Sequence, residues 1–171
     1  MGLFLVRHAE PEIDPTREAS TWGLAPGAEE QLTAIGRQLP ADARHFCSPE
    51  PKAIATARML TPEPVEVVAD LREHERGPAW IDDYDGTVMR ALLRPIEAAH
   101  EGWATCFRTQ QRVVAAVQRL LDRLPGKDLV LVGHGIAWTL LVAEFTDSEP
   151  DPELWAGLGM PDLVVLQPPA D

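Results

Sequence analysis

Two histidines of this sequence each come at the end of a short apolar run. The stretch "LFLVRH" ends at His8, and the stretch "LVLVGH" ends at His134. Such runs predict buried strands, and the carboxyl ends of parallel strands lie at the edge of a sheet where ligands bind. A single histidine at a strand end is more often structural than catalytic. Two histidines in the same context favour a functional site in which both imidazoles face one ligand.

A predicted helix start adds cations to this pair. In "SPEPKA", Ser48 is the expected N-cap and Pro49 the first helical residue, which places Lys52 in the first turn. A helix N-terminus disfavours a cation unless an anion is bound there, although Glu50 could offset the charge of a solvated lysine. Arg7 would be a second fixed cation. Two cations, two imidazoles and a helix N-terminus suit a phosphoryl group better than a carboxylate, because three oxygens need many donors.

Alternating strand and helix patterns predict the elements that position these residues. The expected strands span residues 3–6, 45–47, 65–68, 128–132 and 162–167. The expected helices span residues 28–39, a segment starting at 49, and residues 88–99, 103–124 and 136–145. This order predicts an α/β fold with a mainly parallel sheet and helices on both faces.

Composition narrows the class of protein. The 171 residues carry a formal net charge of −12, which argues against binding to nucleic acid or to an anionic membrane, because both favour a basic face. No apolar stretch approaches the ~18 to 20 residues of a membrane helix, and no signal peptide opens the chain, so we expect a cytoplasmic protein. Cys47 and Cys106 are expected to be buried, reduced thiols.

Four motifs resemble, in order, those of the histidine phosphatase superfamily, which includes the phosphoglycerate mutases. "LVRHAE" resembles its Arg-His-Gly signature, and "SPEPKAIATA" its Ser-Pro-x-x-Arg-Ala-x-x-Thr-Ala segment. "LREHERG" resembles its Leu-x-Glu segment, and "VGHG" its second histidine motif. The resemblance implies a phosphoglycerate mutase-like three-layer sandwich, formed as a single domain over residues 1–171. Within the superfamily, the chain most resembles the short phosphohistidine phosphatase-like members.

The resemblance also implies a role for each matching residue. His8 would be the nucleophile that takes the phosphoryl group, and Arg7 and His134 would hold the phosphate oxygens. Lys52 would stand where the family has its second arginine, and Glu73 would give a proton to the leaving group. No metal or organic cofactor is implied. These roles agree with the chemistry, because a neutral imidazole is a nucleophile near pH 7 and a leaving alkoxide needs an acid.

Within the matching motifs, the chain departs from the family pattern at two positions. Ala9 replaces the usual glycine, and Lys52 keeps the charge of the usual arginine without its planar, two-pronged contact. The residues after Ala9 show no match to the substrate-binding residues of the mutases.

Other side chains compete for roles in the site. The rivals to Glu73 as the acid are Glu75, Asp82, Asp83 and Asp85, in a stretch that otherwise indicates a solvated acidic loop. Arginines that could line a pocket are Arg76, Arg90, Arg94 and Arg108, and tryptophans that could cover it are Trp22, Trp80 and Trp103. Such arginines are more often at the surface, and such tryptophans are more often simply packed.

We therefore expect a phosphatase that hydrolyses a phosphorylated small molecule or a phosphoprotein through a phosphohistidine. One alternative is a catalytically weak or inactive domain that binds a phosphorylated ligand, which the change to Lys52 favours. A phosphoglycerate mutase is a further alternative, disfavoured by the short chain. A metal site built from His8, His134 and Glu73 lacks a close-spaced ligand pair such as His-x-x-x-His.

Overall fold

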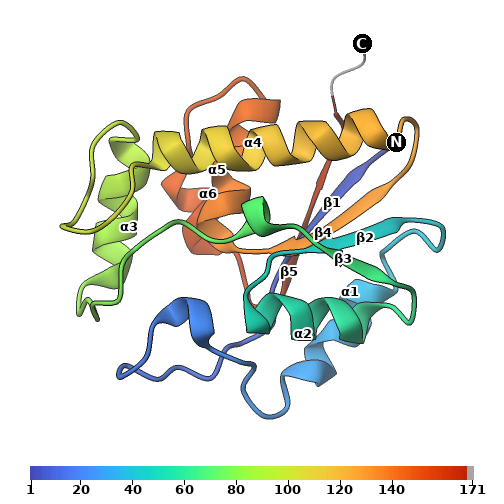
Figure 1. Cartoon of the computed structure of the whole chain (residues 1–171), viewed down its shortest axis with the longest axis horizontal. Helices are drawn as coiled ribbons and strands as arrows, with labels where there is room; N and C mark the ends of the chain where they lie inside the picture. The colour runs from blue at the N-terminus through green and yellow to red at the C-terminus, as the bar shows by residue number, and fades with distance from the viewer. Residues whose placement is uncertain (169–171) are drawn as a thin grey trace.

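A five-stranded sheet of order β3-β2-β4-β1-β5 forms the middle layer of the structure, a computed structural model that describes residues 1–168 (Figure 1). Its strands are β1 (Leu3–Arg7), β2 (Arg44–Cys47), β3 (Val65–Val67), β4 (Leu129–Gly133) and β5 (Asp162–Leu166). β1, β2, β3 and β4 run parallel to one another, and β5 runs antiparallel to β1. This confirms the predicted α/β fold with a mainly parallel sheet.

Helices cover both faces of the sheet (Figure 1). They are α1 (Leu32–Gly36), α2 (Pro51–Leu60), α3 (Tyr84–Leu93), α4 (Cys106–Arg123), α5 (Gly135–Phe145) and α6 (Pro152–Gly157). Successive strand residues point to opposite faces, so Leu5 and Leu131 pack against α4 and α5, and Val6 and Val132 pack against α1 and α2. Among the described residues, no helix is long and apolar enough to cross a membrane.

Two helix boundaries predicted from the sequence are wrong because of prolines. The helix expected to start at Pro49 starts at Pro51, and its extended N-cap is Glu50, not Ser48. The helix expected over 88–99 is α3, which ends at Leu93. In both cases the residue directly before a proline is held away from helical backbone angles, which delays the start of α2 and stops α3 ahead of Pro95.

Two other helices are shorter than predicted. The segment expected as one helix over 28–39 is a 3₁₀ turn at Ala28–Gln31 followed by the short α1. The helix expected over 103–124 starts at Cys106, because the Thr105 hydroxyl oxygen accepts the N–H of Arg108 and caps it there. These differences leave the predicted order of elements unchanged.

Candidate active site

The carboxyl ends of β1 and β4 bring the two strand-end histidines together. Arg7 is paired with Gly133 in the sheet, and the N–H of His8 donates to the Gly133 carbonyl over 2.9 Å. The ring centroids of His8 and His134 lie 5.3 Å apart. Gly133 is required here, because a Cβ at that position would lie 2.5 Å from the Trp138 ring. The two imidazoles therefore share one edge of the sheet.

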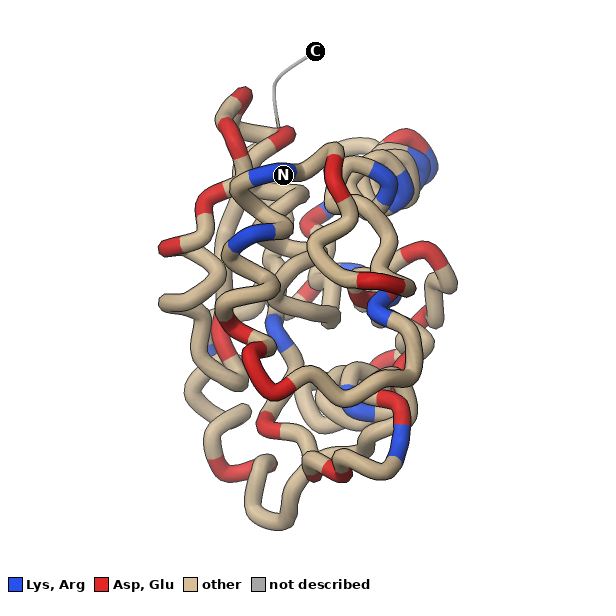
Figure 2. Tube along the Cα trace, turned by 90° about the vertical axis from the view of Figure 1, so that its left-hand side faces the viewer, with Lys and Arg blue, Asp and Glu red and all other residues tan. Residues whose placement is uncertain are grey.

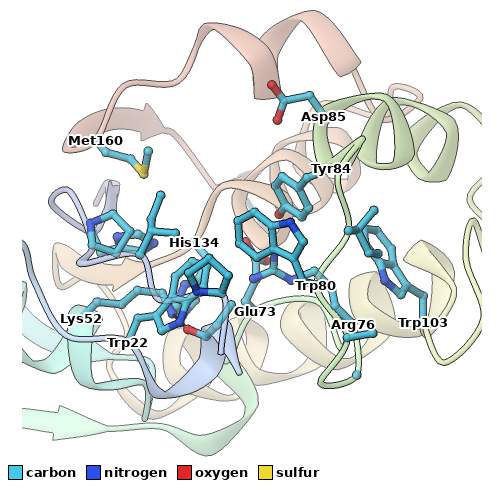
Figure 3. A pocket seen from close by; sticks show the side chains of 18 of the residues that line it. Trp22, Lys52, Glu73, Arg76, Trp80, Tyr84, Asp85, Trp103, His134 and Met160 are labelled. Atoms are coloured by element: carbon cyan, nitrogen blue, oxygen red, sulfur yellow. Dashed lines mark hydrogen bonds between the residues drawn. The ribbon is translucent and has the colours of Figure 1, made fainter. Parts of the chain in front are cut away.

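These histidines line a cavity of about 640 Å³. Arg7, Lys52 and Glu73 line the same cavity, so the structure brings together all five side chains singled out from the sequence. Figure 3 shows Lys52, Glu73 and His134 grouped at one part of the cavity. Their individual roles in catalysis stay predictions.

The hydrogen bond of His8 fixes which of its nitrogens is free. Its Nδ1 lies 2.7 Å from the Ala9 carbonyl oxygen. Because a carbonyl can only accept, Nδ1 carries the hydrogen and Nε2 of the neutral ring holds a free lone pair. Burial, together with the neighbouring His134, Lys52 and Arg7, lowers the pKa of His8 well below its ordinary value. His8 is thus a neutral imidazole with the form that a nucleophile needs.

Buried nitrogens beside the cavity lack partners. His134 is fully buried, and its Nε2 lies 2.7 Å from the Ser48 hydroxyl, but its Nδ1 has no hydrogen-bond partner within residues 1–168. In Arg7, Nη1 donates to the Leu158 carbonyl over 2.6 Å, whereas Nε is unpartnered in that same range. Buried polar atoms are normally satisfied, so these two nitrogens are available as partners for a polar ligand.

Lys52 is a buried member of an ion pair and not a solvated first-turn residue. Only 3% of the residue is exposed, and its Nζ lies 2.5 Å from Glu50 Oε2 and 2.6 Å from the Ala19 carbonyl. The other carboxylate oxygen of Glu50 accepts the backbone N–H of Glu73 and lies 3.4 Å from His134 Nε2. A carboxylate that does not itself line the cavity therefore offsets the positive charge of Lys52.

Glu73 is held by the N-terminus of α5. Its Oε1 accepts the N–H groups of His74 and Ala137, and its Oε2 accepts the N–H of Ile136. A carboxylate oxygen has two lone pairs, so Oε2 is the oxygen with room for a proton. The guanidinium of Arg112 donates to the Glu73 carbonyl over 3.0 Å and fixes this segment from the side of α4.

The remaining side chains considered from the sequence divide between the cavity and the surface. Those that line the cavity are Arg76, Asp85, Trp22, Trp80 and Trp103. Those that do not line it are Glu75, Asp82, Asp83, Arg90, Arg94 and Arg108. Glu75 pairs with Arg72, and Asp83 pairs with Arg90, at the surface. Asp85 is therefore the rival to Glu73 that reaches the cavity.

Sequence reasoning missed three supporting contacts. Ser48 was expected to cap a helix, but its hydroxyl meets His134. Thr56 accepts the N–H of Ala9 over 3.0 Å and ties α2 to the turn after His8. Both residues belong to the "SPEPKAIATA" motif, so the motif itself was the available signal. Arg112 lies in no motif, and nothing local in the sequence marks it.

Acid is expected to destabilise the fold through its buried histidines. Burial lowers the pKa of His74 to about 4 and holds those of His8 and His134 well below about 6.5, the value expected in an unfolded chain. Below pH 6.5 the unfolded chain binds protons that the folded chain does not, so the free energy of unfolding falls by up to about 1.4 kcal/mol per pH unit for each of these groups. Full stability is reached above pH 6.5.

Urea unfolding between pH 7.5 and 5 measures this slope. The His74→Gln variant removes one of the three groups, so its slope should be shallower by about 1.4 kcal/mol per pH unit. A free energy of unfolding that stays flat between pH 7.5 and 5.5 would contradict the neutral state of these histidines.

The fold and the site together define an α/β protein whose cavity, at the carboxyl edge of its sheet, is lined by two histidines, Arg7 and Lys52. Residues 3–166 match the model of the histidine phosphatase superfamily (branch 1). The chain belongs to this superfamily, which confirms the resemblance found in its motifs. No curated relative matches the sequence.

Solved structures share this fold at low sequence identity. YhfR of Bacillus stearothermophilus is 23% identical with a TM-score of 0.78, over 97% of this chain and 90% of that one. The mycobacterial glucosyl-3-phosphoglycerate phosphatase, in a complex with VO3, is 21% identical with a TM-score of 0.78, also over 97% of this chain and 90% of that one. Phosphoserine phosphatase of Entamoeba histolytica is 16% identical with a TM-score of 0.75, over 96% and 89%. At these identities the likeness shows the fold.

Proposed function

We propose that this protein is a phosphatase that hydrolyses phosphomonoesters, of a small molecule or of a protein side chain, through a phosphohistidine. The observation that supports it most directly is the free lone pair on His8 Nε2 in a cavity that also holds Arg7, Lys52 and His134. The named phosphatases among the structural neighbours agree with this activity. The unpaired, buried thiols of Cys47 and Cys106 support a cytoplasmic location.

In the proposed first step, Nε2 of His8 attacks the phosphorus and the bond to the ester oxygen breaks. Arg7, Lys52 and the Nδ1–H of His134 stabilise the charge on the other phosphoryl oxygens, with Nε2 of His134 accepting from the Ser48 hydroxyl. A proton on Glu73 Oε2 passes to the leaving alkoxide. In the second step, water attacks the phosphohistidine, Glu73 takes its proton, and inorganic phosphate leaves.

Turnover of p-nitrophenyl phosphate, with and without a metal chelator, tests the proposal. We expect release of phosphate at the same rate in both conditions, because every proposed step uses side chains of this chain. The Glu50–Lys52 pair favours the second candidate function, a domain that binds a phosphorylated ligand without turning it over. Binding of inorganic phosphate with no detectable turnover would select that second function.

Glu73→Gln is expected to act selectively on esters with poor leaving groups. An alkyl phosphate needs a proton on its leaving oxygen, whereas p-nitrophenolate leaves without one. We expect kcat to fall by about 10²- to 10⁴-fold for an alkyl phosphate and far less for p-nitrophenyl phosphate in its first, phosphoryl-transfer step. Single-turnover kinetics on both esters measure that step.

The matched control is Asp85→Asn, which removes the other carboxylate that reaches the cavity. If Asp85→Asn shows the selective loss and Glu73→Gln does not, Asp85 is the proton donor. Equal losses on both esters in Glu73→Gln would point to a structural role for Glu73 at the α5 N-terminus.

A further inference from the structure

The aromatic residues of this chain are concentrated on the walls of the cavity. Four of its five tryptophans and its single tyrosine line that space, although aromatic residues make up only 6% of the sequence. They come from separate segments: Trp22 from the loop after β1, Trp80 from the loop before α3, Tyr84 from α3, Trp103 from the loop before α4, and Trp155 from α6. Figure 3 shows Trp80 and Tyr84 near Glu73 and His134, with Trp103 on the far side of Trp80.

Several apolar side chains on these walls are open to solvent. Ile13 is 57% exposed, Trp80 is 51% exposed and Met160 is 36% exposed, and all three line the cavity. The indole N–H of Trp80 donates to Asp82 over 3.0 Å, which holds the ring in place. Exposed apolar groups that converge on one hollow mark a binding surface. Packing of the core does not explain them, since they remain exposed.

The walls carry few charges. Five lining residues form the polar end of the cavity: Arg7, His8, Lys52, Glu73 and His134. The other charged lining residues within the described chain are Arg17, Arg76 and Asp85. The Arg17 guanidinium donates to the Thr21 carbonyl, and the Arg76 guanidinium lies 4.8 Å from the centroid of the Tyr84 ring. Acidic positions are spread through the loops on this side of the molecule (Figure 2). Outside the polar end, the lining therefore consists mostly of apolar and aromatic side chains, with two arginines and one carboxylate among them.

We infer that the alcohol part of the substrate is uncharged and apolar, with a ring or a chain of several carbons that packs against these walls. This inference rests on the proposed phosphatase function, which places the phosphate beside His8. The polar end then binds the phosphoryl group, and the aromatic walls select the group that leaves. Phosphate esters of sugars, amino acids and hydroxy acids fit such walls less well, because most of the lining offers their hydroxyl and carboxylate groups no partner in place of water.

A series of phosphate esters of primary alcohols tests the inference without changing the leaving-group chemistry. The esters are methyl, butyl and 2-phenylethyl phosphate, compared with glycerol 1-phosphate and phosphoserine. Each buried methylene is worth roughly a 4-fold gain in binding. We expect kcat/KM to rise along the apolar series, with 2-phenylethyl phosphate roughly 100-fold above methyl phosphate, and the two polar esters near or below methyl phosphate.

Trp80→Ala tests the wall itself. It should lower kcat/KM for 2-phenylethyl phosphate by roughly 10-fold while changing that for methyl phosphate less than 2-fold. The matched control is Phe107→Ala, because Phe107 is 47% exposed and lies outside the cavity. That control should behave like the unaltered protein on every ester. Urea unfolding of both variants shows that the fold is retained.

The outcomes separate this inference from the proposed function. Equal kcat/KM for methyl and 2-phenylethyl phosphate, or a preference for phosphoserine, would overturn the inference and leave the phosphatase intact. If no ester is hydrolysed, the proposed function fails, and binding decides the inference. The cavity tryptophans then report the binding of 3-phenylpropylphosphonate and ethylphosphonate through their fluorescence. Tighter binding of the phenyl compound by roughly 10-fold or more supports an apolar ligand, and equal binding overturns it.

Discussion

Protein that carries His8→Ala will hold no acid-labile, base-stable phosphate when it is denatured during turnover, whereas the unaltered protein will. The reason is that Nε2 of His8 is the free, unprotonated nitrogen beside Arg7 and Lys52 in the cavity. Removal of a nucleophile leaves only binding and electrostatic stabilisation, so we expect kcat to fall by about 10³-fold or more. Quenching with labelled phosphomonoester, followed by acid or base treatment, measures the label.

The matched control is His45→Ala, which removes another buried histidine that does not line the cavity. That variant should keep both the label and the turnover. Urea unfolding at pH 7.5 checks that the loss in His8→Ala is not a loss of fold. Label that persists in His8→Ala would end the assignment of this residue as the nucleophile.

Lys52→Met will lose both stability and activity. Its ammonium is buried against Glu50, so removing it leaves an uncompensated buried carboxylate and should cost about 3 to 5 kcal/mol in the free energy of unfolding. A solvated first-turn lysine would give the opposite sign, because its removal would relieve a conflict with the helix dipole. Loss of one charge-assisted hydrogen bond to phosphate should also reduce kcat/KM about 10- to 150-fold.

A double variant separates these two effects. In Lys52→Met with Glu50→Gln, no buried carboxylate is left uncompensated and the side-chain amide oxygen can still accept the N–H of Glu73, so most of the lost stability should return. Activity should stay low, because the phosphate still lacks its cation. The single variant Glu50→Gln keeps Lys52 but removes the competing carboxylate, and it should bind inorganic phosphate more tightly. Unchanged kinetics in Lys52→Met would exclude Lys52 from the site.

The sequence predicted the sheet and the placement of its two histidines because both depend on local patterns. The two strands that precede the histidines, β1 and β4, are short runs of leucine, valine and phenylalanine, and a parallel sheet collects its strand ends on one edge. The helix boundaries were less certain, because a proline acts on the backbone of the residue before it. Glu50 shows this directly: Pro51 keeps it extended and makes it the N-cap that places its carboxylate beside Lys52.

The walls of the cavity could not be predicted in the same way. Trp22, Trp80 and Trp155 lie far apart in the sequence and belong to two loops and a short helix, so no periodicity connects them. The bonds that hold Glu73 also depend on a tertiary contact, between the segment after Leu71 and the first turn of α5. A motif could identify Glu73 as a candidate acid, but not which of its oxygens is free to carry a proton.

The position of β1 in the sheet has a consequence for how the protein is made. β1 begins at Leu3, yet its neighbours β4 and β5 begin at Leu129 and Asp162. At about 5 to 20 residues per second, a ribosome needs roughly 6 to 25 s to reach β4 after it has made β1. Until then this apolar strand has no partner on either side and must be kept from pairing with other chains. His8 is thus translated well before His134, with which it shares the site, and acquires its surroundings late.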